Sequence, residues 1–133
     1  MLDVEVLGSG LAPGAPPEDV IRRLCAAAAA SAGVHDGHLA IEFVDAARIT
    51  RLNAEHRGEE SPTDVLSFPI DGADAAPAAV PRELGDVVIC PEHTQDLREA
   101  VVHGVLHLLG MDHETDDGQM LERQRELLAR EVR

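Results

Sequence analysis

The chain has 133 residues and a mass of 14.2 kDa, the size of one ordinary domain. Aromatic residues make up only 2% of it, which excludes nucleic-acid modules that stack bases on a platform of aromatic side chains. The formal net charge of -14 repels nucleic acid and anionic membranes at long range. With 44% hydrophobic residues the chain can still bury an aliphatic core, so we expect a single globular domain over residues 1–133.

Apolar periodicity predicts four strands and four helices. Alternation of apolar and polar residues indicates strands, and apolar residues three or four positions apart indicate helices. Asp45 is a good N-cap for the second helix, and Gly33 is a good stop for the first. In chain order we expect a strand over 2–6, a helix from about 16 to 33, a strand over 38–44, a helix from 45 to about 56, strands over 65–70 and 85–90, and helices over about 92–109 and 117–132.

This order of elements predicts an α+β fold, in which helices pack on one small mixed four-stranded sheet. Pro69 indicates that the third strand lies at an edge of the sheet or ends there. The segment from Asp71 to Leu84 is rich in Ala, Pro, Gly and Asp, and we expect a long mobile loop. The apolar stripe of the last helix is predicted to contain Leu121, Leu127 and Leu128.

Features of the whole chain predict a cytoplasmic protein. The first residues are acidic and alternating, unlike the basic start and apolar stretch of a signal peptide. No apolar run approaches the roughly 18 residues that a membrane span requires. Cys25 and Cys90 lie far apart without a CxxC partner, so we expect two buried, reduced thiols.

One segment carries the spacing of a metal site at the end of a helix. His103 and His107 are four residues apart, which places both imidazoles on one helix face. Gly110 is positioned to end the helix with a left-handed cap and to turn His113 back toward them. Three neutral imidazoles suit zinc and leave a fourth tetrahedral position for water, whose pKa falls to about 7 on the ion.

The segment differs from the zinc signature of metalloproteases at one decisive position. That signature has a glutamate after the first histidine, whereas this chain has Gly104, which cannot act as a general base. Asp112 adjoins a predicted ligand, and we expect its carboxylate to orient an imidazole. The alternative is that Asp112 only forms the turn.

A second stretch, from Leu52 to Pro69, reads by periodicity alone as a helix end, a turn and a strand, with Arg57 exposed. Together with two later segments, however, it resembles the YbeY family of bacterial metal-dependent endoribonucleases, also called rRNA maturation factors. The resemblance depends on Arg57 with the run Thr63-Asp64-Val65-Leu66-Ser67-Phe68-Pro69, on the run Leu84-Gly85-Asp86-Val87-Val88-Ile89-Cys90, and on the histidine segment from His103 to Glu114.

The resemblance implies a site and a substrate. It implies one zinc ion per chain on His103, His107 and His113, and a catalytic role for Arg57. It also implies a single-strand-specific endoribonuclease that acts in maturation of the small-subunit rRNA 3′ end and in ribosome quality control, with RNA and not DNA as substrate. His56 stands where family members usually carry an aromatic side chain.

The acidic charge conflicts with tight binding of free RNA, because few phosphates can be neutralised. Arg48, Arg51 and Arg57 are expected to form a local positive strip on the second helix. We therefore expect docking on a ribosomal particle, with a ribosomal protein or a GTPase as partner. Two other functions stay open: a zinc-dependent hydrolase of peptides or small amides, and a non-catalytic ribosome-associated zinc module.

Overall fold

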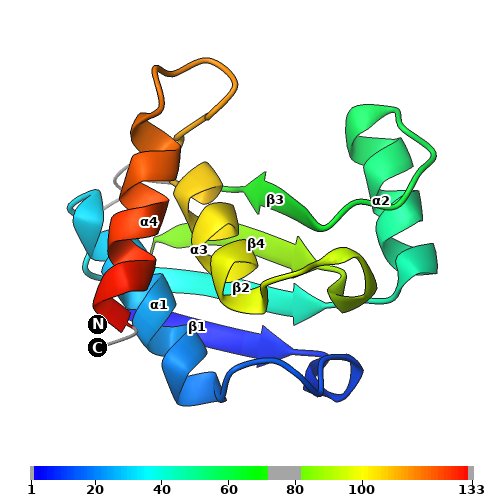
Figure 1. The fold of residues 1–133 in the computed structure, drawn as a ribbon, viewed down its shortest axis with the longest axis horizontal. Coiled ribbons are helices and arrows are strands. Elements are labelled where there is room, and N and C mark those ends of the chain that lie inside the picture. The colour runs from blue at the N-terminus through cyan, green and yellow to red at the C-terminus, as the bar shows by residue number, and fades with distance from the viewer. Residues whose placement is uncertain (1, 72–81, 132–133) are drawn as a thin grey trace.

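The computed structural model describes residues 2–71 and 82–131, and it has the predicted order of helices and strands (Figure 1). Most of the predicted loop, residues 72–81, lies outside the described residues. The elements are β1 (Leu2–Leu7), α1 (Glu18–Ser31), β2 (Gly37–Phe43), α2 (Ala46–Arg57), β3 (Val65–Pro69), β4 (Glu83–Ile89), α3 (Leu97–Leu108) and α4 (Gln119–Glu131), with short 3₁₀ turns at Ser9–Leu11 and Pro91–His93.

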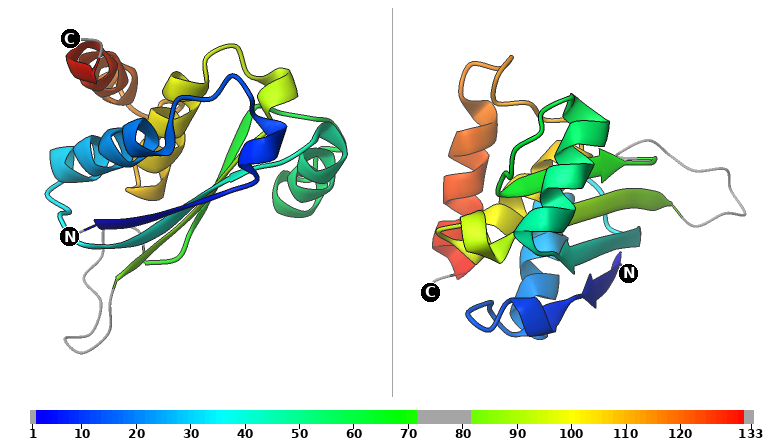
Figure 2. Two further views of the ribbon diagram at one scale, coloured as in Figure 1. Left: turned by 90° about the horizontal axis from the view of Figure 1, so that it is seen from below. Right: turned by 90° about the vertical axis from the view of Figure 1, so that its right-hand side faces the viewer.

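The four strands form one mixed sheet in the order β1-β2-β4-β3. β1, β2 and β4 run parallel to one another, and β3 pairs antiparallel with β4 at the edge. The edge position predicted from Pro69 is confirmed. Helices α1, α3 and α4 lie on one side of the sheet and α2 lies on the other (Figure 2). The predicted α+β fold is therefore confirmed.

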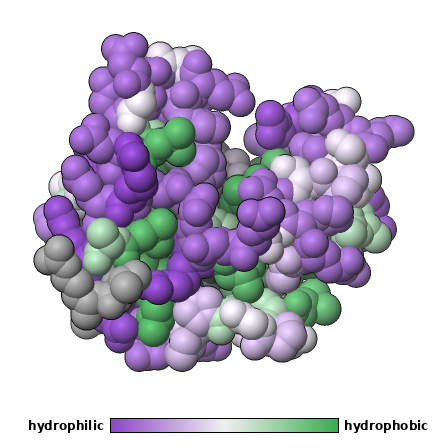
Figure 3. All heavy atoms as spheres, in the orientation of Figure 1, coloured by the Kyte–Doolittle hydropathy of each residue, from purple (hydrophilic) through white to green (hydrophobic). Residues whose placement is uncertain are grey.

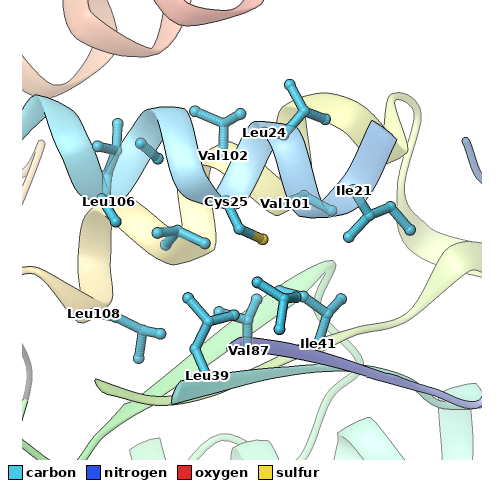
Figure 4. Packing of buried hydrophobic residues seen from close by; sticks show 14 of the residues in the cluster. Ile21, Leu24, Cys25, Leu39, Ile41, Val87, Val101, Val102, Leu106 and Leu108 are labelled. Carbon is cyan, nitrogen blue, oxygen red and sulfur yellow. The ribbon is translucent and has the colours of Figure 1, made fainter. Parts of the chain in front are cut away.

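The main core fills the space between the sheet and helices α1 and α3 (Figure 4). Alternate residues of the strands point into it, as the period of 2 requires. A smaller cluster on the opposite face joins α2 to β3 and β4 through Ile49, Leu66 and Val88. Both cysteines are free and buried, as predicted, and burial raises the pKa of the Cys25 thiol to about 12.

Two boundaries differ from prediction because of local hydrogen bonds. Helix α3 begins at Leu97 and not near residue 92, since the Asp96 carboxylate caps it by accepting hydrogen bonds from the N–H groups of Arg98 and Glu99. Strand β4 begins two residues early, at Glu83. The N–H of Asp71 donates a hydrogen bond of 2.7 Å to the carbonyl of Glu83, so the two ends of the predicted loop extend the pairing of β3 with β4.

The predicted stripe of α4 is wrong at one position. Leu127 is buried, but the side chain of Leu121 is 41% exposed. Met120 faces the core instead, and Gln124 is buried one turn later. Leu128 is partly buried against the core, so Leu121 is the one misplaced residue, and a polar side chain enters the buried stripe.

Gly104 brings α3 into close contact with the sheet. A Cβ atom at this position would lie 2.3 Å from Cγ1 of Val87 and 3.3 Å from Cγ2 of Val65. The Gly104 carbonyl also accepts a hydrogen bond of 2.8 Å from the hydroxyl of Ser67 on β3. A side chain of any size at residue 104 would push the histidine helix away from β3 and β4.

We expect Gly104→Ala to lower the free energy of unfolding by about 1–2 kcal/mol. Overpacking costs about 1–3 kcal/mol, and about 2–3 kcal/mol is expected here because the added Cβ would meet two branched valine side chains; the helix propensity of alanine returns about 1 kcal/mol. Chemical denaturation measures the difference. Gly14→Ala is the matched control, because a Cβ at Gly14 meets no atom within 4 Å. Equal stability of Gly104→Ala and the unmodified protein would contradict this packing.

The face of the sheet that carries α2 also holds a histidine among carboxylates. Nδ1 of His38 lies 2.8 Å from Oε2 of Glu83, and Nε2 lies 3.7 Å from Oε1 of Glu5. The hydrogen bond with Glu83 raises the pKa of His38, and the negative charges of Glu83, Asp3 and Glu5 add to this effect against the opposing effect of burial.

This pair should stabilise the fold mainly at low pH. The pKa of His38 is higher in the folded protein than its unfolded value of about 6.5. The pair therefore contributes its full stabilisation below about pH 6.5, and this contribution is lost as the pH rises through the folded pKa. His38→Gln should therefore destabilise the protein most near pH 6 and least near about pH 9. Urea titrations of both proteins across this range test the trend, and a difference that grows with pH would refute it.

Candidate metal centre

Helix α3 places two of the three predicted histidines one turn apart near its C-terminus. The Nε2 atoms of His103 and His107 lie 3.1 Å apart, and the ring centroids are separated by 4.7 Å. Both side chains are partly buried, while the opposite face of the helix packs in the core. The spacing of four residues therefore directs both imidazoles to one point.

The chain turns sharply after α3 and returns the third histidine to the same point. Gly110 has a φ of 93°, its N–H donates to the carbonyl of His107, and the N–H of Met111 donates to that of Leu106. This pair of bonds is the Schellman cap that glycine favours. The His113 ring centroid lies 5.1 Å from that of His103. The predicted glycine corner is present.

The three rings together fit a divalent transition-metal ion. Each offers a nitrogen, and these nitrogens all lie within 4.8 Å of one another. Three nitrogens about 2.0–2.1 Å from a tetrahedral ion would be separated by roughly 3.4 Å, which is compatible with this cluster. Burial lowers the pKa of His107, and the neighbouring His103 and His113 lower it further. A neutral ring is the form that binds a metal.

The structure gives the surroundings of the histidines in more detail than the sequence did. Nδ1 of His103 lies 2.8 Å from Oε1 of Gln124 on α4, a contact that sequence reasoning missed. The sequence signal that could have revealed this contact is a glutamine between Met120 and Leu127 on the apolar face of α4. Oδ1 of Asp112 accepts a hydrogen bond of 2.9 Å from the N–H of Glu114, which is a turn contact. The predicted orienting role of Asp112 stays a prediction.

A cavity of about 630 Å³ connects the histidine cluster to the end of α2. Figure 3 shows the surface hollowed between the α3–α4 side of the molecule and α2. All three histidines line the cavity, and Arg57 lines it as well. Among the described residues Arg57 is the only arginine in this lining, so the predicted strip with Arg48 and Arg51 does not extend into the site.

The turn after α2 fixes the position of Arg57. Gly58 ends the helix with a φ of 74°. Asn53 is 1% exposed, and its Nδ2 donates a hydrogen bond of 2.9 Å to the carbonyl of Ser61, which ties the turn to the helix. The His56 ring packs against Phe68 of β3 with a centroid distance of 4.6 Å. These contacts hold the end of α2 beside the edge strand.

A second cavity, of about 420 Å³, lies on the other side of the cluster. His103, His113, Asp64 and Val65 border both cavities. Two of the three rings, those of His103 and His113, therefore border both cavities.

Comparison with known proteins identifies the family. A family model described as Endoribonuclease YbeY matches residues 15–131. The chain belongs to the YbeY endoribonuclease family. The predicted resemblance is confirmed, and so is the predicted endoribonuclease class, a hydrolase that acts on RNA. Neither the peptidase nor the non-catalytic alternative is favoured.

Relatives of the YbeY family match most of the chain. Endoribonuclease YbeY of Alkalilimnicola ehrlichii is 46% identical over 115 residues, which cover 76% of this chain and 68% of the relative. The protein of the same name from Bacillus cytotoxicus is 37% identical over 130 residues, which cover 83% of each chain. A solution structure of a Thermotoga maritima protein superposes with a TM-score of 0.56 at 26% identity, over 96% of this chain and 88% of that one.

None of the described helices combines the length and the apolar character needed to cross a membrane.

Proposed function

We propose that His103, His107 and His113 hold one zinc ion, beside which Arg57 binds the scissile phosphate of a single-stranded RNA. The observation that carries this proposal is the convergence of three imidazole nitrogens within 4.8 Å at the wall of a cavity that Arg57 also lines. Arginine is suited to this role because its planar guanidinium can donate two parallel hydrogen bonds to a phosphate.

The ion, when bound, polarises a phosphoryl oxygen and lowers the pKa of a water molecule. The remaining tasks fall to the protein. Ser67 and Gly104 lock β3 against α3 through their hydrogen bond, which keeps the cavity wall in place relative to the histidines. The Arg57 guanidinium would orient the phosphate and stabilise the negative charge that grows on its oxygens during cleavage.

The charge of the site favours a substrate delivered by a larger particle. Asp64, Asp112 and Glu114 line the same cavity as Arg57, and the whole chain has a net charge of -14. Such a surface neutralises few phosphates, so affinity for free RNA should be weak. We infer that the protein acts in the cytoplasm on rRNA near the 3′ end of the small subunit, docked on a ribosomal particle through a ribosomal protein or a GTPase.

Cleavage assays before and after metal removal test the proposal. Elemental analysis of the purified protein should find about one zinc ion per chain. A chelator should abolish cleavage of single-stranded RNA, and added Zn²⁺ should restore it. Casein should not be cleaved, since Gly104 cannot supply a general base. Metal-independent RNA cleavage, or casein cleavage at a comparable rate, would overturn the proposal.

A further inference from the structure

Helix α4 brings one buried polar side chain against the histidine cluster. Gln124 is 5% exposed and lies in the stripe that packs on α3. Its Oε1 is 2.8 Å from Nδ1 of His103, 21 residues earlier in the chain. Burial of an amide side chain is unfavourable unless it is hydrogen-bonded, so this contact accounts for a glutamine at a core position.

The chemistry of this contact fixes which nitrogen of His103 carries the proton. An amide oxygen can only accept a hydrogen bond, so Nδ1 of His103 must be the donor. In a neutral imidazole the other nitrogen, Nε2, then keeps its lone pair. That same Nε2 is the atom that faces His107 at 3.1 Å. The proton is therefore on the side of the ring away from the cluster.

The packing of α4 holds Gln124 in place. Met120 and Leu127, one turn before and one turn after it, are 0% and 2% exposed and belong to the main core. These two residues anchor the face of α4 that carries Gln124, and the amide itself borders the second cavity together with His103. The contact between Gln124 and His103 comes from α4, outside the segment from His103 to His113 that carries all three rings.

We propose that Gln124 is a positioning residue, which holds His103 in the Nδ1–H tautomer and aims Nε2 at the metal. The inference rests on the proposed metal site but not on RNA cleavage. It makes α4 a part of the centre, although no histidine lies on that helix. Partners that orient a ligating histidine typically contribute 10–100-fold to metal affinity.

Two substitutions separate the acceptor from the packing. Gln124→Met preserves the length of the side chain but removes the amide oxygen, and Gln124→Glu preserves an acceptor oxygen at nearly the same position. Zn²⁺ affinity, measured by competition with a chromophoric chelator at pH 8, should fall about 10–100-fold in Gln124→Met. It should stay equal or become tighter in Gln124→Glu. Leu128→Met, which alters packing on the same helix, is the matched control and should bind Zn²⁺ normally.

A second measurement needs neither metal nor a stable variant. Nitrogen-15 spectra of the histidine rings in the metal-free unmodified protein should show His103 with its proton on Nδ1. A proton on Nε2 would overturn the proposal, and so would an unchanged Zn²⁺ affinity in a folded Gln124→Met protein. Because neither readout involves RNA, failure here is distinct from failure of the proposed cleavage activity.

Discussion

Replacing His107 with alanine should remove the bound metal and abolish RNA cleavage. His107 is one of the three ligands of the proposed site: its ring centroid lies 4.7 Å from that of His103, one turn earlier on α3, and 5.5 Å from that of His113. Two imidazoles alone leave the ion without the three protein ligands that zinc sites in hydrolases require. We expect zinc content to fall from one per chain to nearly zero, and cleavage to fall by at least about 1000-fold.

The control is a histidine outside the cluster. His35 is exposed and lies before β2, so His35→Ala should keep both zinc and activity. Elemental analysis and cleavage of single-stranded RNA are measured on the same preparations, with circular dichroism to confirm the fold. Since His107 is partly buried beside core residues, some loss of stability is expected as well. A folded His107→Ala protein that retained full activity would rule out the histidine cluster as the reaction centre.

The part of the site that is local in sequence could be predicted from it. A separation of four residues determines the relation between His103 and His107, and a glycine three residues later determines the turn that returns His113. Each of these relations depends on helix geometry and on the backbone freedom of glycine. They hold whatever the rest of the chain does, and the structure reproduces them.

The parts that depend on long-range packing could not be predicted from spacing. Arg57 lines the same cavity as the histidines only because β3 pairs with β4 at the edge and α2 packs on the other face of the sheet. Periodicity alone read Arg57 as a surface residue, and only the family resemblance assigned it to the site. Gln124 was missed because its partner lies 21 residues away, and because Leu121 was expected on the buried face of α4, where the structure has Met120.

The position of Gly104 shows how packing bears on function. The sequence indicated only that a general base was missing at this position. The structure adds that no side chain fits there, because Val87 and Val65 occupy the space that a Cβ would need. A glutamate at residue 104, where metalloproteases carry their general base, would require α3 to move away from the sheet. The close packing of this helix therefore excludes a general base at that position.

Replacing Arg57 with alanine should abolish RNA cleavage and leave the metal in place. Arg57 lines the same cavity as the histidines but lies on α2, so its loss removes the proposed phosphate-binding cation and none of the proposed ligands of the ion. Loss of one such charge-stabilising donor typically slows catalysis about 100–1000-fold. Arg57→Lys keeps the charge but not the planar fork, and should recover only part of the rate.

Arg51→Ala separates the local effect of Arg57 from the effect of net charge. Arg51 is exposed on the same helix but does not line the cavity. Because both residues are arginines, Arg51→Ala changes the net charge of the chain by the same amount as Arg57→Ala. Cleavage by Arg51→Ala should stay within about twofold of the unmodified protein, because an exposed charge outside the site is largely screened by salt. Zinc content should be one per chain in all three variants. If Arg51→Ala were as inactive as Arg57→Ala, the arginines would act through the overall field, and a direct contact of Arg57 with the phosphate would be excluded as the cause.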